Sequence, residues 1–175
     1  MSRRPFLGTI AFVLFGGPLL AVVAGPWLLT GFHIGRPLFG WEPVRWIGAA
    51  LIILGSSLFL SLLPRFVRQG RGTPSPAAET EHLVVTGAYR FVRNPMYVAV
   101  LGILLGEGLL LGSAAVLVFA AAMAVAFALF VRLYEEPRLG QRFGDDYERF
   151  RREVPRWIPR LRPHRSQPSP SGGRR

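Results

Sequence analysis

Four stretches of this sequence carry almost no charge, and polar or basic segments separate most of them. At about 1.5 Å per residue, a helix of roughly 17–25 apolar residues crosses the hydrocarbon layer of a membrane, which is about 30 Å thick. A soluble four-helix bundle would instead carry a polar stripe along each helix. The pattern predicts an all-α polytopic membrane protein with four transmembrane helices, over Phe6–Phe32, Val44–Leu63, Pro95–Leu111 and Ala114–Val131.

Prolines and glycines predict where these helices bend, end and turn. Pro18 and Pro26 interrupt the first apolar run, and we expect one kinked span because membrane helices tolerate proline better than soluble ones. Pro64 is expected to close the second span. Only Gly112 and Ser113 separate the last two runs, which predicts a tight antiparallel helical hairpin.

A different periodicity follows the fourth run, in EEPRLGQRFGDDYERFRREVPRWIP. Its apolar residues are spaced 4, 4, 3 and 4 apart, which places them on one face of a helix. Pro155 and Pro159 are expected to end that helix. The pattern predicts a C-terminal cytoplasmic amphipathic helix with an apolar face made of Leu139, Phe143, Tyr147, Phe150 and Val154.

The distribution of charge predicts the orientation. The net charge is +11 and all 21 basic residues are arginines, which gather near the N-terminus, in residues 64–94 and from Arg132 onward. The connection 33–43 holds only Arg36. By the positive-inside rule, both termini and the middle loop face the cytoplasm, and we expect a multi-pass protein of a bacterial inner membrane. The charge then indicates orientation and attraction to anionic lipids rather than a nucleic-acid partner.

Several kinds of chemistry are excluded by the sequence. It has no cysteine, which rules out thiolate catalysis and cysteine-based metal sites. The three histidines, His33, His82 and His164, are scattered and lack metal-ligand spacing, so we expect no metal. Neither GxGxxG nor GxxxxGK[ST] occurs, and no length of soluble α/β sequence remains for a Rossmann domain.

The segment YRFVRNPMY, residues 89–97, is the first candidate for a site. Pro95 favours a helix start and Asn94 is a good N-cap residue, so a helix N-terminus is predicted beside Arg90 and Arg93. Such an arrangement binds anions. The alternative is that these arginines and tyrosines are ordinary anchors at the membrane interface.

The second candidate is the segment RLYEE at the end of the fourth span. Arg132 and Glu136 are four residues apart and can pair on one helical face, either as a boundary salt bridge or as part of a site with Glu135. The hairpin should bring this segment next to Asn94–Tyr97, with the amphipathic helix folded over both. Glu107, inside the third span, is a third candidate, although it lies near the outer end and can simply reach the interface.

Taken together, HLVVTGAYRFVRNPMY, a helical hairpin and RLYEEPRLGQRFGDDYERFRREVPRWIP resemble the isoprenylcysteine carboxyl methyltransferase and phospholipid methyltransferase superfamily, over residues 79–160. These membrane enzymes use S-adenosylmethionine without a Rossmann domain. The resemblance implies that Glu135 or Glu136 holds the amino group of the cofactor and that Arg132 faces the substrate. It implies a catalytic role for Arg132 and Glu136, and a cofactor pocket lined by His82, Leu83, Val84, Tyr89, Asn94, Pro95, Met96 and Tyr97. The family often has histidine at the position of Asn94, and asparagine cannot titrate.

The apolar runs, the composition of the tail and this resemblance together divide the chain into four parts. Residues 1–64 form two N-terminal transmembrane helices, and 65–94 form a cytoplasmic loop with the cofactor motif. Residues 95–160 form the catalytic region, and 161–175 form a disordered basic tail. The expected activity is methyl transfer from S-adenosylmethionine to a lipophilic small-molecule or lipidated acceptor in the bilayer, through a carboxylate, thiol or amine. The alternative is a non-catalytic membrane protein whose arginine-rich tail binds anionic lipid or a partner.

Overall fold

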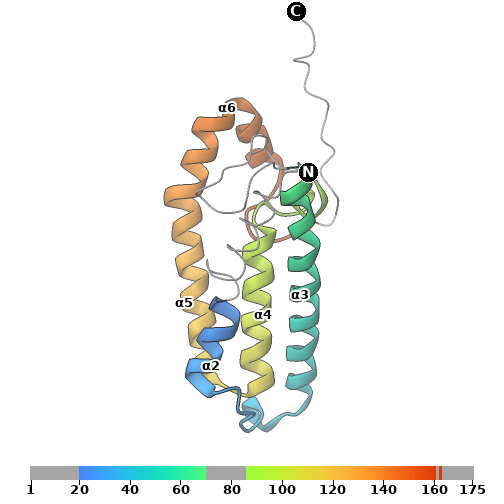
Figure 1. The fold of residues 1–175 in the computed structure, drawn as a ribbon, viewed down its shortest axis with the longest axis vertical. Helices are drawn as coiled ribbons and strands as arrows, with labels where there is room; N and C mark the ends of the chain where they lie inside the picture. The colour runs from blue at the N-terminus through green and yellow to red at the C-terminus, as the bar shows by residue number, and fades with distance from the viewer. Residues whose placement is uncertain (1–19, 70–85, 161, 163–175) are drawn as a thin grey trace, which may run out of the picture.

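The computed structural model describes residues 20–69, 86–160 and 162, and this part of the chain contains helices and no strand. Among the described residues, three long helices run along the length of the molecule, and a fourth caps one end (Figure 1). The all-α prediction is confirmed for the described residues. In chain order the elements are η1 (Leu20–Ala24), α2 (Gly25–Thr30), η2 (Leu38–Gly40), α3 (Pro43–Gln69), η3 (Gly87–Arg90), α4 (Pro95–Leu111), α5 (Ala114–Phe130), η4 (Val131–Glu135) and α6 (Glu136–Glu153).

The predicted hairpin between α4 and α5 is present. Gly112 follows α4 with φ of 67°, the left-handed conformation that glycine adopts without strain. The Ser113 hydroxyl oxygen then accepts a hydrogen bond from the Val116 N–H at 3.3 Å, which caps α5. The turn therefore reverses the chain within two residues and sets the two helices antiparallel.

Helices α3 and α4 pack closely because glycines line their contact. A Cβ atom added at Gly48 would lie 2.6 Å from the Gly106 carbonyl oxygen, and one at Gly55 would lie 2.8 Å from that of Ala99. Small residues let helix backbones approach in this way, and they are typical of helix contacts in membranes. Of the helix pairs that the structure describes, α3 and α4 have the most extensive contact.

The apolar span runs from Pro43 to Pro64, so Pro64 closes the second span as predicted, but the helix itself continues through Pro64 to Gln69. Proline removes one intrahelical hydrogen bond, and a helix that is fixed on both sides of the proline can continue past it.

Two helices are long and apolar enough to cross a membrane, within Pro43–Pro64 and in the helix that starts at Ala114, and only 17% of each apolar window is buried. The core helix of a soluble protein would be mostly covered. Here large apolar side chains such as Trp46, Ile53 and Val118 are exposed, which suits a lipid environment. Leu20–Thr30 and Pro95–Leu111 form shorter apolar helices. The part of the first predicted span before residue 20 lies outside the described residues.

Helix α6 follows α5 without a break, through the π-helical turn η4, and then folds over the end of the bundle (Figure 1). Its predicted apolar face is present: Tyr147, Phe150 and Val154 are buried, with Leu139 and Phe143 packed against them. The helix has a kink that its apolar spacing does not predict. Gly144 has φ of 51° and ψ of −126°, so it divides α6 into two pieces that point in different directions.

Candidate active site

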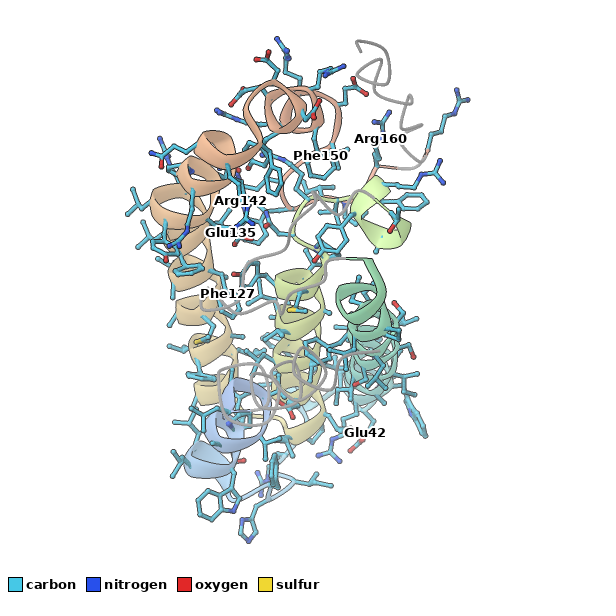
Figure 2. The ribbon with its side chains drawn as sticks, turned by 45° about the horizontal axis from the view of Figure 1, so that its top comes forward. Glu42, Phe127, Glu135, Arg142, Phe150 and Arg160 are labelled. Carbon is cyan, nitrogen blue, oxygen red and sulfur yellow. The ribbon has the colours of Figure 1, made fainter. Side chains whose placement is uncertain are left out.

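The site candidate lies where the start of α4 meets the turn η4, at the end of the molecule that α6 covers. Glu135 and Phe150 lie at this end, and Glu42 lies at the opposite end (Figure 2). The Tyr97 hydroxyl donates a hydrogen bond to Glu135 Oε2 at 3.1 Å, across 38 residues of sequence. Arg93 Nη1 donates to Glu136 Oε1 at 2.8 Å. The hairpin therefore brings the two candidate segments together, as the sequence predicts.

Glu136 is held by two arginines. Besides Arg93, Arg156 binds both carboxylate oxygens, with Nε 2.8 Å from Oε1 and Nη2 2.6 Å from Oε2. The Glu136 side chain is 9% exposed and that of Arg93 is 10% exposed, so these charges are largely removed from water. Paired arginine–carboxylate bonds of this kind are strong and directional. Glu136 thus joins three segments of the chain at one point.

The predicted pairing of Arg132 with Glu136 is wrong. Arg132 is exposed and makes no hydrogen bond or ion pair with the described residues, whereas Glu136 is buried. The helix has a π-helical turn here, in which the Glu136 N–H bonds to the Val131 carbonyl, five residues back. The Glu136 carboxylate bonds Arg93 and Arg156 instead of Arg132.

Glu135 has a different environment from its neighbour. It is half-buried, and among the described residues only the Tyr97 hydroxyl bonds its carboxylate. Burial raises the pKa of Glu135 above its ordinary value, the Tyr97 hydrogen bond lowers that pKa and the nearby Glu136 raises it. The Tyr97 ring lies 4.8 Å from that of Phe127 and 6.3 Å from that of Trp157. Glu135 is therefore a carboxylate beside aromatic rings, and no cation from the described residues is bound to it.

A short segment after α6, Val154–Arg160, crosses the start of α4, and we call it the C-terminal strap. The Arg93 N–H donates to the Pro155 carbonyl at 2.9 Å, and the Arg160 N–H donates to the Phe91 carbonyl at 3.0 Å. These backbone bonds hold the strap along residues 91–94. Trp157, which contacts Tyr97, belongs to this strap.

Asn94 occupies the predicted cap position, with non-helical φ of −118° and ψ of 56°, but the prediction that its side chain caps α4 is wrong. Its Nδ2 group donates instead to the Arg156 carbonyl at 3.1 Å, and the residue is 8% exposed. The Asn94 side chain thus bonds the strap and makes no bond to the first turn of α4.

The remaining predicted residues fall into four groups. Pro95 and Met96 are buried in the first turn of α4. Tyr89 packs against the apolar face of α6, and burial raises its pKa. Glu107 is three turns away on α4, too far to join this site. His82, Leu83 and Val84 lie outside the described residues.

Sequence reasoning missed Phe127, Arg156 and Trp157. Phe127 was indistinguishable from other apolar residues of its helix. Arg156 and Trp157 stand between two prolines in PRWIP, a pattern that indicates an extended segment but not what it covers.

The side chains of this site suit a ligand with an ammonium group and an aromatic part. A half-buried carboxylate can hold an ammonium group, and the rings of Tyr97, Phe127 and Trp157 can contact a planar base or a cation. Within the ranges that the structure describes, no group of three histidine, aspartate or glutamate side chains could hold a metal ion.

Comparison with known families gives a match over most of the described helices. Residues 44–146 match the family model described as phospholipid methyltransferase, a range that runs from α3 through the hairpin into α6 and is more than half of the 175 residues. A comparison with curated proteins gives no match.

Proposed function

Because this chain belongs to the phospholipid methyltransferase family, whose members are membrane methyltransferases, we propose that it transfers a methyl group from S-adenosylmethionine to a hydrophobic acceptor dissolved in the membrane. The acceptor group would be a carboxylate, a thiol or an amine, as in isoprenylcysteine carboxyl methyltransferases and their relatives. The proposed topology has four spans, with both termini and the site on the cytoplasmic side of a bacterial inner membrane.

The observation that carries this proposal is Glu135. It is a half-buried carboxylate that Tyr97 orients and that no cation neutralises among the described residues. We assign it the amino group of the cofactor. The aromatic rings of Tyr97, Phe127 and Trp157 stand beside it and can contact the rest of that molecule. His82, Leu83, Val84, Tyr89, Asn94, Pro95 and Met96 are proposed to complete the lining.

When bound, S-adenosylmethionine supplies a methyl group that is already activated by a positive sulfur. The protein then has to align the acceptor and exclude water. A carboxylate acceptor is already ionised, and a thiol or amine needs only modest deprotonation. Asn94, which cannot titrate, is therefore compatible with this chemistry.

Glu136 and Arg132 receive separate roles. Glu136 is bound to Arg93 and Arg156, so we propose that it supports the site by fixing these arginines rather than by holding the cofactor. Arg132 is exposed beside Leu133, which is 71% exposed, and so stands at the edge of the apolar surface of α5. There it can meet a carboxylate or phosphate on an acceptor that arrives sideways through the bilayer.

Direct ligand binding tests the proposal. Purified protein in detergent or nanodiscs should bind S-adenosylhomocysteine, measured by calorimetry. Glu135→Gln should weaken binding about tenfold or more, because a charge-assisted hydrogen bond is lost without a change of shape. Glu42→Gln, at the opposite end of the molecule, should leave the affinity unchanged and serves as the matched control. Folded wild-type protein that does not bind the ligand would overturn the proposal.

A further inference from the structure

Asn94 makes a contact that its position in a helix start does not explain. It stands directly before Pro95, where a side chain would ordinarily bond the first turn of α4. Its amide reaches instead across 62 residues of sequence to the Arg156 carbonyl in the C-terminal strap. Asn94 is 8% exposed, and its hydrogen bond to the Arg156 carbonyl is partly buried. Removal of the donor would leave this carbonyl without that partner in a place that water reaches poorly, which costs free energy.

Arg156, whose carbonyl accepts this bond, connects the strap to Glu136 and, through the next residue, to the Tyr97–Glu135 pair. The guanidinium of Arg156 binds both oxygens of Glu136. The next residue, Trp157, places its ring 6.3 Å from that of Tyr97. Tyr97 in turn bonds Glu135. A displacement of the Arg156 peptide would therefore move two groups at once, the Arg156 guanidinium that binds Glu136 and the Trp157 ring beside Tyr97.

We infer that Asn94 is a positioning residue that fixes the C-terminal strap over the site, through its side-chain hydrogen bond to the Arg156 carbonyl. This inference rests on the function proposed above. Asn94 acts through Arg156 and Trp157 and does not itself take part in proton transfer. The backbone bonds of Arg93 to Pro155 and of Arg160 to Phe91 flank this side-chain bond, so the strap is held at three successive points.

Hydrogen–deuterium exchange measures the strap without reference to catalysis. Asn94→Leu keeps the size of the side chain and removes the donor. The amides of Arg93 and Arg160, which bond across the strap, should then exchange about tenfold faster, the size expected for one buried hydrogen bond. Amides inside α4 and α5 should keep their protection, which shows that the fold is intact.

The same variants should be tested for S-adenosylhomocysteine binding. Asn94→Leu should weaken binding about tenfold, and Asn94→His, measured at pH 8 where a neutral imidazole offers an N–H donor, should restore both strap protection and affinity. A merely space-filling role would give the opposite ranking, because leucine matches the size of asparagine better than histidine does.

Two results would overturn the inference. One is unchanged exchange at Arg93 and Arg160 in Asn94→Leu, and the other is faster exchange with unchanged affinity. A wild-type protein that fails to bind the ligand would count against the proposed function instead, since the exchange measurement of the strap stands without it.

Discussion

Glu135 and Glu136 are neighbours in the chain, but their carboxylates have different surroundings. Glu136 bonds two arginines, whereas Glu135 bonds a tyrosine hydroxyl. Burial raises the pKa of Glu135 above its ordinary value of 4.5. An ammonium ligand needs the ionised form, so its affinity should be full above the raised pKa and fall as the pH drops through it.

The pH dependence of S-adenosylhomocysteine binding checks this expectation. The loss of affinity should begin at a higher pH than for an exposed carboxylate, and Glu135→Gln should remove this step from the profile. The stability of the ligand-free protein should run in the opposite direction. The folded state raises the pKa of Glu135. Its contribution to the free energy of unfolding is therefore fully present at a pH below the ordinary pKa and is lost as the pH rises through the raised pKa. A binding profile identical in both proteins would contradict the assignment.

Removing the charge of Glu136 should cost stability rather than only affinity. Glu136→Gln would leave Arg93, whose side chain is 10% exposed, without its anion. Breaking a buried pair by removing one partner typically costs about 3–5 kcal/mol. The free energy of unfolding, measured by denaturant titration in detergent, should fall by about this amount. Glu148→Gln breaks an exposed pair with Arg151 and should cost less than about 1 kcal/mol. Equal effects of the two variants would argue against a structural role for Glu136.

At the scale of elements, Gly144 decides where the end of the chain goes. Its φ of 51° with ψ of −126° is open to glycine and strained for other residues. The second piece of α6 carries Tyr147 and Phe150 into the apolar cluster, and the strap follows.

Gly144→Ala should therefore destabilise the closed arrangement by about 1–3 kcal/mol, seen as a lower melting temperature and weaker ligand binding. Gly140→Ala is the matched control, four residues earlier on the same helix. Its Cβ would lie 3.9 Å from the Tyr147 ring, an ordinary contact, so it should be neutral or slightly stabilising. If both variants behaved alike, the bend at Gly144 would not matter to closure.

At the scale of the whole molecule, the proposed topology places η2 outside and α6 inside the cell. The chain has no cysteine, so a single introduced thiol reports its own location. Phe39→Cys lies in η2 at a position that is 95% exposed, and Arg152→Cys lies on the exposed face of α6. A membrane-impermeant maleimide should label the first in intact cells and the second only after the membrane is opened. Labelling of both from one side would exclude the four-span arrangement.

The sequence by itself determined the helical class, the hairpin and the apolar face of α6. Apolar runs, a Gly-Ser turn and a spacing of three and four residues are local patterns, and each has few structural solutions. The proximity of Tyr97 to Glu135 followed from the same hairpin, because antiparallel neighbours place their adjoining ends side by side.

Only the tertiary structure decided which side chains bond to which. Pro64 is accommodated within α3, the Asn94 side chain bonds the strap instead of its own helix, and Glu136 bonds Arg93 and Arg156 instead of Arg132. These local preferences range from a few tenths of a kcal/mol for a helical ion pair to about 3 kcal/mol for a proline, and contacts from distant parts of the chain can exceed them. The bend at Gly144 turns the end of the chain back, and Arg156 and Trp157 then reach the site. Such a bend depends on the burial of Tyr147 and Phe150 against distant parts of the chain, which a local sequence pattern does not contain.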